Sequence, residues 1–232
     1  MLDAQNINQF YGSSHTLRGV SLSIRQGECM ALLGRNGVGK TTLLKCLMGV
    51  QSISSGSISF AGHDIGTLPP HARAKLGMAY VPQGREIFAR LTVEENILMG
   101  MATKPSRQAH DIKDEVFDLF PVLRTMLNRR GGDLSGGQQQ QLAIARALVA
   151  DPKLIIFDEP TEGIQPSIIK DIGRVINLLR NRGDIAILLC EQYFDFAREL
   201  ADRFVVLSRG EVVAAGDRSE MDSETVRKHL SV

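Results

Sequence analysis

The clearest candidate for chemistry is the run Gly34–Thr41, which reads GRNGVGKT and fits the phosphate-binding pattern G-x-x-x-x-G-K-[ST] at every fixed position. In that pattern the glycines free backbone N–H groups for nucleotide phosphates, Lys40 adds a positive charge and Thr41 offers an oxygen to Mg²⁺. A glycine turn that happens to precede a lysine is the alternative. We predict binding of ATP or GTP, with contacts from Gly34, Arg35, Asn36, Gly37, Val38, Gly39, Lys40, Thr41 and Thr42.

Two adjacent carboxylates, Asp158 and Glu159, follow the apolar run Leu154–Phe157. Parallel strands present their carboxyl ends at one edge of a sheet, so a buried strand here would bring both acids beside the phosphate loop. Asp158 would then hold Mg²⁺, and Glu159 would face the attacking water as general base. A strand that ends in a solvated acidic turn is the alternative.

A second candidate anion site is the serine–glycine turn, Ser135, Gly136, Gly137 and Gln138, which follows Leu134 and opens a helical pattern. Free N–H groups, the positive end of a helix and a hydroxyl would all meet there. An ordinary serine N-cap is the alternative. Since one γ-phosphate needs only one loop, we expect this turn to act on a nucleotide held by another subunit in a face-to-face dimer.

Strand-like and helical runs alternate along the chain, which is typical of an α/β domain with a mainly parallel sheet. The phosphate loop joins a strand to a helix, as its pattern requires. The expected strands are Leu2–Gln9, Val20–Arg25, Cys29–Leu33, Ser57–Phe60, Met78–Val81, Leu154–Phe157, Ala186–Cys190, Phe204–Ser208 and Glu211–Ala215. The expected helices are Thr41–Met48, Val93–Met99, Asp111–Phe120, Gly137–Ala150, Ile168–Arg182 and a short surface helix within Ser219–Leu230.

The stretch from Gly84 to Ala150 is almost wholly helical in pattern. We therefore expect residues 1–232 to form a single domain, in which a helical sub-domain of residues 84–150 is inserted into a nucleotide-binding core of residues 1–83 and 151–232. The serine–glycine turn would belong to the inserted part.

Composition restricts the environment of the chain. With 43% apolar and 23% charged residues and a net charge of +1, it has an ordinary globular composition and no strong field to attract nucleic acid. No apolar run approaches the ~20 residues that span a bilayer, and the first thirty residues show no export signal. Three separated cysteines in apolar surroundings favour free thiols, and we expect a cytosolic protein.

The phosphate loop, Gln83, the serine–glycine turn, the run Leu154–Glu159 and the pair Glu191-Gln192 after Ile187–Leu189 together resemble the ATP-binding subunit of an ABC transporter in identity and order. The resemblance covers nearly the whole chain, and Ser-Gly-Gly-Gln is its most family-specific element. It implies a P-loop NTPase core with a mainly parallel sheet, an antiparallel β sub-domain and an inserted helical sub-domain. It also implies ATP hydrolysis with Mg²⁺, coupled to transport.

The resemblance implies roles for further residues. Tyr11 would stack on adenine, and Gln83 would contact Mg²⁺ and water and couple the site to the membrane partner, with Gly84–Leu91 near the groove for a permease helix. The catalytic residues would be Glu159, Gln83, Gln192 and Lys40, and the metal ligands Thr41, Gln83 and Asp158. A core tyrosine and a surface glutamine are the alternatives for Tyr11 and Gln83.

The implied partners are a second ATPase subunit, identical or different, membrane permease subunits and, indirectly, an external solute-binding protein. Nucleic acid is not expected. The chain would lie on the cytoplasmic face of the cell membrane. ATP would hold two ATPase subunits together, and hydrolysis would release them.

The chain departs from the family pattern at three places. Gln192 stands where the family has a histidine that bonds the γ-phosphate, and glutamine carries no charge. Gln141 stands where many relatives have arginine, and the loop Glu162–Pro166 lacks the usual Ala-Leu-Asp. Because Lys40, Thr41, Asp158 and Glu159 are present, we still predict hydrolysis.

Within the family, Tyr80–Phe88 resembles the uptake group for branched-chain amino acids, urea and amides. The runs Ser14–Gly19, Gly34–Gly39 and Glu191–Ala197 are more similar to the urea-type subunit, so we expect urea as solute. The alternatives are a branched-chain amino acid or short-amide importer, a non-transport ATPase of this type, and a nucleotide sensor with negligible turnover. A P-loop kinase would leave the serine–glycine turn without a role.

Overall fold

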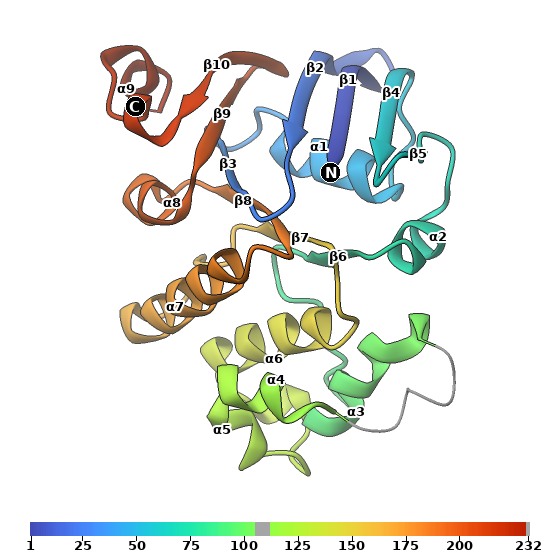
Figure 1. Ribbon diagram of the computed structural model, residues 1–232, viewed down its shortest axis with the longest axis vertical. Coiled ribbons are helices and arrows are strands. Elements are labelled where there is room, and N and C mark those ends of the chain that lie inside the picture. Colours follow the sequence, from blue (N-terminus) through green and yellow to red (C-terminus); the bar gives the residue numbers. More distant parts are fainter. Residues whose placement is uncertain (105–111, 231–232) are drawn as a thin grey trace.

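The central sheet of the computed structural model has six strands: β3 (Cys29–Leu33), β6 (Met78–Val81), β7 (Leu154–Asp158), β8 (Ala186–Glu191), β9 (Arg203–Ser208) and β10 (Glu211–Asp217). Their order is β10-β9-β3-β8-β7-β6, and β10 alone pairs antiparallel (Figure 1). All residues of β3, β7 and β8 are buried. Their continuous apolar runs therefore reflect cover on both faces of the sheet. The structure describes residues 1–104 and 112–230.

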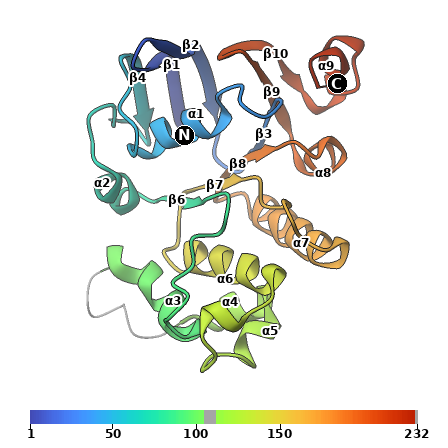
Figure 2. The ribbon, with the colours of Figure 1, turned by 180° about the vertical axis from the view of Figure 1, so that it is seen from behind.

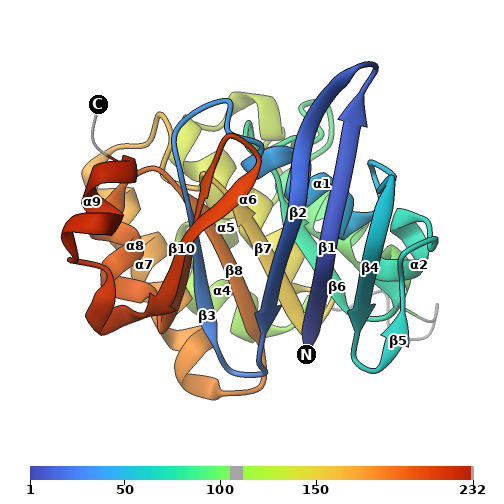
Figure 3. The same ribbon diagram turned by 90° about the horizontal axis from the view of Figure 1, so that it is seen from above.

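A second, antiparallel sheet contains β1 (Leu2–Tyr11), β2 (Ser14–Ile24), β4 (Ser55–Phe60) and β5 (His63–Asp64), in the order β2-β1-β4-β5. Figure 3 shows β2, β1 and β4 side by side with α1 (Lys40–Met48) behind them. Apolar side chains of β1, β2, β4, α1 and the central sheet form one buried cluster. The helix that begins at the phosphate loop is thus fixed between two sheets.

The other face of the central sheet is covered by α6 (Gly136–Leu148) and α7 (Pro166–Arg182). Side chains of β7 alternate between the two faces, with Leu154 and Ile156 toward α1 and Ile155 and Phe157 toward α6 and α7. This alternation follows from the period of two in a strand. The end of the chain adds α8 (Phe194–Leu200) and α9 (Glu224–Leu230), which pack beside β3 and β9.

The segment between β6 and β7 is helical and lies below the sheets in Figures 1 and 2. It contains α3 (Val93–Met99), η1 (Gly100–Thr103), α4 (Asp114–Leu119), α5 (Pro121–Arg124), η3 (Gly131–Asp133) and α6. The helix predicted from Asp111 begins at Asp114: Asp111 lies outside the described residues, and Ile112 and Lys113 are described but not helical. The division of the chain at residues 84 and 150 stays a prediction.

Short elements depart from the sequence expectations. The strand predicted from Val20 begins at Ser14, and the predicted helix Ser219–Leu230 is split into η4 (Arg218–Glu220) and α9. β5, α8 and α2 (Pro70–Lys75) were not predicted. α2 depends on a tertiary contact, because the buried Arg73 donates to the carbonyl oxygens of Cys46 and Leu47 at the end of α1. A cation there also interacts favourably with the helix dipole.

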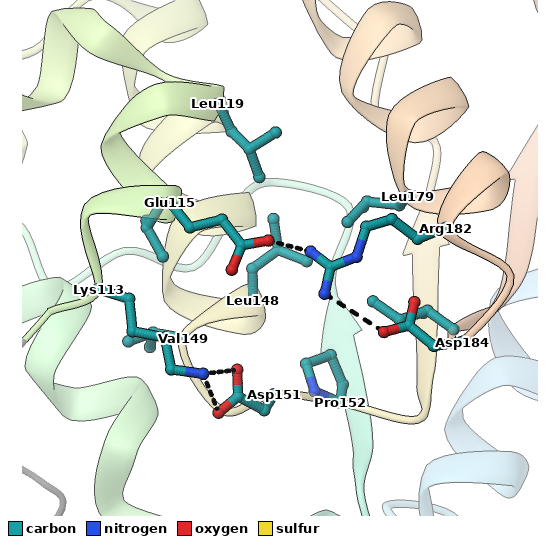
Figure 4. A pocket seen from close by; sticks show the side chains of 12 residues that line it. Lys113, Glu115, Leu119, Leu148, Val149, Asp151, Pro152, Leu179, Arg182 and Asp184 are labelled. Carbon is teal, nitrogen blue, oxygen red and sulfur yellow. Dashed lines mark hydrogen bonds and ion pairs between the residues drawn. The ribbon is translucent and has the colours of Figure 1, made fainter.

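Ion pairs join the helical segment to the core along one seam (Figure 4). Lys113 Nζ, beside α4, lies 2.9 Å from Asp151 Oδ2, and Arg182 at the end of α7 pairs with Glu115 and Asp184. Most of these side chains are about half exposed, so the surrounding water screens each pair. The seam therefore orients the helical segment more than it stabilises the fold.

Candidate nucleotide-binding site

The phosphate loop Gly34–Thr41 connects β3 to α1 at the carboxyl edge of the central sheet. Gly34 has a φ of +150°, and a Cβ there would lie 2.4 Å from the carbonyl oxygen of Leu207. Neither the backbone angle nor the space suits a larger residue. The glycine thus lets the loop pack closely against the end of β9. The loop then leads into the start of α1, where unpaired N–H groups and the helix dipole favour a phosphate.

Lys40 is the first residue of α1, and its ammonium group lies inside the loop. Its Nζ donates to the carbonyl oxygens of Gly34 (2.7 Å) and Arg35 (3.0 Å), and lies 3.2 Å from Glu159 Oε1. The side chain is 4% exposed, and a buried charge requires such partners. The positive charge is therefore fixed at the centre of the loop and beside the second carboxylate of β7.

Asp158 ends β7 next to the phosphate loop, as the parallel topology predicts. The Thr41 hydroxyl lies 3.4 Å from its Oδ1, and the Tyr80 hydroxyl donates to its Oδ2 at 2.9 Å. Burial raises the pKa of Asp158, and hydrogen bonds from Tyr80, Cys190 and Thr41 oppose the rise. Thr41 and Asp158 place hard oxygen donors side by side, which fits Mg²⁺.

The carboxylate of the buried Glu159 contacts side chains from three other segments of the chain. Besides Lys40, its carboxylate accepts hydrogen bonds at Oε2 from Gln192 Nε2 (2.6 Å) and Gln83 Nε2 (3.4 Å). Its φ of +50° is unusual for a residue other than glycine, and backbone strain of this kind often marks functional sites. The structure thus brings together four residues that the sequence analysis singled out separately.

Two other carboxylates near Glu159 have contacts that the sequence analysis did not predict. The buried Glu191 accepts hydrogen bonds from Thr161 N (3.1 Å) and Thr161 Oγ1 (2.8 Å) at one oxygen and from Gln192 N (3.1 Å) at the other. Burial raises its pKa, and these hydrogen bonds oppose the rise. Glu162 accepts from Gln83 Nε2 at 2.8 Å. An acid at the end of the buried run Ala186–Cys190 was the available signal for Glu191.

The serine–glycine turn is organised as a helix start. Ser135 is the N-cap of α6, and a capping box joins it to Gln138: Ser135 N donates to Gln138 Oε1 (2.9 Å), and Gln138 N to Ser135 Oγ (3.4 Å). A Cβ on Gly137 would lie 2.8 Å from Ile168 Cγ1, so α6 approaches α7 closely there. Ser135 is exposed. No hydrogen bond among residues 1–104 and 112–230 joins this turn to the phosphate loop.

The remaining predicted contacts lie at the periphery of the site. Tyr11 is the last residue of β1 and is 48% exposed, so its ring is accessible to the adenine of a nucleotide. Gln83 and Gln192 are exposed residues, but their side-chain amide groups reach Glu159.

Comparison with known proteins identifies this arrangement. The family model for "ABC transporter" matches residues 17–162, from before the phosphate loop to beyond Glu159. The chain belongs to the ABC transporter family. It is accordingly an ATPase of that family, which agrees with the ATP alternative of the sequence prediction.

Three curated relatives match over nearly their full length. BraG of Pseudomonas aeruginosa, a high-affinity branched-chain amino acid transport ATP-binding protein, is 41% identical, with 92% of this chain and 91% of BraG covered. LivF of Archaeoglobus fulgidus, a probable protein of the same kind, is 39% identical (95% and 94%). LptB of Haemophilus influenzae, a lipopolysaccharide export ATP-binding protein, is 35% identical (98% and 95%).

Solved structures confirm the predicted fold. A nucleotide-free ATP-binding cassette of an ABC transporter matches with a TM-score of 0.85 at 27% identity, covering 100% of this chain and 95% of that one. The ADP conformation of the ABC cassette MJ1267 matches with a TM-score of 0.84 at 26% identity (100% and 99%). None of the helices in the described part of the chain has the length and apolar content that a membrane crossing needs.

Proposed function

We propose that the chain is the ATP-hydrolysing motor subunit of an ABC importer, and that the imported solute is urea. The observation that carries the motor assignment is the cluster around Glu159, where a general base, the phosphate-loop lysine and two amides meet within hydrogen-bond distance. A binding module without turnover would not need a carboxylate at this position.

The residues of the cluster have complementary roles. The bound triphosphate competes with Glu159 for Lys40, so that nucleotide binding frees the carboxylate to accept a proton from the attacking water. Gln83 and Gln192 orient that water through their amides, and Gln192 does so without charge. Thr41, Asp158 and the side chain of Gln83 would hold Mg²⁺, which neutralises charge on the phosphates when bound.

The serine–glycine turn completes the site of a second ATPase subunit. Its N–H groups and hydroxyl lie at a helix start, Ser135 is exposed, and among the described residues the turn has no hydrogen bond to the phosphate loop. Closure of two subunits would place the turn on the γ-phosphate bound by the other subunit. Hydrolysis then depends on closure, in a homodimer or a heterodimer.

The membrane partner docks in a groove of about 370 Å³ between β6 and α6. Met99, Phe88 and Tyr80 supply apolar surface, and Glu86 and Arg146 supply charge. Arg146 donates to the carbonyl oxygens of Arg85 and Glu86, which ties the segment after Gln83 to α6. A cytoplasmic helix of the permease is the proposed occupant. The chain then lies on the cytoplasmic face of the membrane, and an external solute-binding protein delivers the solute.

The choice of solute is supported by sequence motifs remote from any solute. The runs Ser14–Gly19 and Glu191–Ala197 favour urea. The names of BraG and LivF favour a branched-chain amino acid as the alternative. LptB, whose name refers to export, has lower sequence identity to this chain than BraG and LivF have.

Co-purification with the membrane subunits, followed by a solute-stimulated ATPase assay, tests the proposal. We expect urea, delivered by its binding protein, to stimulate hydrolysis more than leucine or short amides do. Stimulation by leucine alone would transfer the assignment to branched-chain amino acids. ATP turnover no faster than that of a Glu159→Gln variant in the same complex would exclude the motor function and favour a nucleotide sensor.

A further inference from the structure

Tyr80 is in contact with two regions that have different tasks. Its hydroxyl donates to Asp158 Oδ2 at 2.9 Å, at the proposed metal site. The same residue lines the groove between β6 and α6, together with Phe88 and Arg146.

The register of the sheet explains how the hydroxyl reaches Asp158. β6 pairs in parallel with β7, and Tyr80 lies opposite Ile156, two residues before Asp158. Successive side chains of a strand alternate between faces, so Ile156 and Asp158 point to the same side. The phenol extends along that side to the carboxylate.

The hydrogen bond determines how the Asp158 carboxylate is oriented. Tyr80 engages Oδ2, which leaves Oδ1 facing the Thr41 hydroxyl at 3.4 Å. Asp158 is 1% exposed, so no bulk water replaces the phenol as a partner. Partners that orient a metal-binding side chain in this way contribute to metal affinity.

Two of the elements that line the groove lead to different halves of the proposed composite site. β6 carries Tyr80, which contacts Asp158 directly. α6 carries Arg146, and Ser135 is the N-cap of the same helix. β6 and α6 lie next to each other in Figures 1 and 2. An occupant of the groove would therefore contact both Tyr80, which holds Asp158 at the proposed metal site, and α6, which begins at the serine–glycine turn.

We infer that Tyr80 is a positioning residue, which orients Asp158 for Mg²⁺ and transmits occupancy of the groove to the metal site. The first part concerns this chain alone. The second part rests on the proposed function, because it requires a membrane partner in the groove.

The first part is tested with Mn²⁺ as the probe and the full chain saturated with a non-hydrolysable ATP analogue. Free Mn²⁺ is measured by electron paramagnetic resonance. Tyr80→Phe keeps the ring and removes the hydroxyl, and we expect it to weaken Mn²⁺ binding on the order of tenfold. Metal-free nucleotide affinity should not change. Tyr193→Phe, at a tyrosine 51% exposed on another loop, is the matched control and should bind Mn²⁺ like the parent.

A double-mutant cycle separates positioning from a general structural effect. If Tyr80 acts through Asp158, Tyr80→Phe should not weaken Mn²⁺ binding further in an Asp158→Asn background. Parent-like Mn²⁺ affinity of Tyr80→Phe, or additive losses in the cycle, would overturn the assignment.

A measurement without substitution at Tyr80 covers the case in which the variant does not fold. The chain has three tyrosines, and 3-fluorotyrosine can replace all of them. The ¹⁹F resonance of Tyr80, identified by comparing Tyr11→Phe and Tyr193→Phe samples, should shift when Mg²⁺ is added to the nucleotide-loaded chain. A resonance that does not respond to Mg²⁺ would contradict the contact.

The second part is tested in the complex with the membrane subunits. We expect Tyr80→Phe to retain binding to these subunits and to lose most of the solute-dependent stimulation of hydrolysis. Full stimulation would overturn the link to the groove and leave the metal result intact. If the parent chain does not bind the membrane subunits, the proposed function fails, whereas the Mn²⁺ and ¹⁹F experiments still decide the role of Tyr80.

Discussion

The phosphate loop and the serine–glycine turn are both candidate anion sites at helix starts, but their surroundings differ. The phosphate loop contains the buried Lys40, which contacts two carbonyl oxygens and Glu159 of the same chain. The serine–glycine turn is exposed at Ser135, and its capping box pairs Ser135 with Gln138. The phosphate loop is connected to the cluster around Glu159, whereas no hydrogen bond among the described residues connects the turn to that cluster.

This difference bears on how the chemistry is divided between subunits. A buried cluster that contains a base, a lysine and two amides is ready for a nucleotide within one chain. The capping box satisfies the N–H groups of Ser135 and Gln138, so the turn keeps its shape without a ligand. We therefore expect substitutions in the phosphate loop to affect an isolated chain, and those in the turn to affect only an assembly.

The largest effect is expected for Lys40→Ala. The change removes the charge at the centre of the phosphate loop, so ATP binding and hydrolysis should be lost together. Isothermal titration and an ATPase assay measure the two quantities. Lys45→Ala, at an exposed position of the same helix, is the control. Retained ATP affinity in Lys40→Ala would break the assignment of this loop.

Glu159→Gln separates binding from chemistry. An amide cannot act as the base, so kcat should fall by roughly 10² to 10⁴ while ATP binding remains. The ATP-loaded dimer should accumulate, which size-exclusion chromatography with ATP detects. Glu94→Gln, at an exposed acid of α3, should behave like the parent. Loss of ATP binding in Glu159→Gln would contradict the proposed role.

Ser135→Arg tests the other side of the comparison. A bulky cation at the start of α6 blocks approach of a second subunit's nucleotide, and hydrolysis in the assembly should fall on the order of 10²-fold. Nucleotide affinity of the isolated chain should not change. Ser219→Arg, in the exposed η4, is the matched control. Full hydrolysis by the Ser135→Arg assembly would show that the turn is not part of the site.

Glu191→Gln is expected to have an intermediate effect. Its carboxylate connects the loop of Thr161 to the backbone of Gln192, and an amide nitrogen cannot accept one of these hydrogen bonds. We expect kcat to fall about tenfold and the free energy of unfolding to fall by roughly 1–3 kcal/mol. Chemical denaturation and steady-state kinetics measure both. If Glu191→Gln has the kcat of the parent but a lower free energy of unfolding, Glu191 has a structural role only.

The smallest effect is expected for the ion pairs at the seam between the helical segment and the core. Burial disfavours the charged form of Asp151, but hydrogen bonds and charge from Lys104 and Lys113 outweigh it and lower the pKa of Asp151. The contribution to stability is therefore present above the ordinary carboxyl pKa and is lost as pH falls through the lowered value.

Asparagine tolerates the positive φ of +52° at this position, so Asp151→Asn keeps the backbone and removes the charge together with one of the two oxygens that accept from Lys104 and Lys113. We expect a loss of roughly 0.2–1 kcal/mol in unfolding free energy at neutral pH, which decreases below the ordinary carboxyl pKa and disappears once pH is below the lowered pKa of Asp151. Thermal unfolding across pH measures this difference. A loss that persists at low pH would point to a packing effect rather than to the ion pairs.

The sequence predicted those parts of the site that depend on local pattern. The phosphate loop and the run Leu154–Glu159 each carry their signal within a few residues, and their proximity follows from parallel pairing. The contacts of Tyr80 and Glu191 were not predictable, because they depend on which strands are neighbours and on loop geometry. α2 escaped prediction because its position depends on the buried Arg73 rather than on an apolar period.

The most direct test of the composite site is a structure of the ATP-loaded Glu159→Gln protein in its assembly. We predict that Ser135 Oγ and Gly137 N lie about 3 Å from the γ-phosphate held by the phosphate loop of the other ATPase subunit. A closed, ATP-loaded assembly in which the serine–glycine turn faces solvent, away from every triphosphate, would contradict the account.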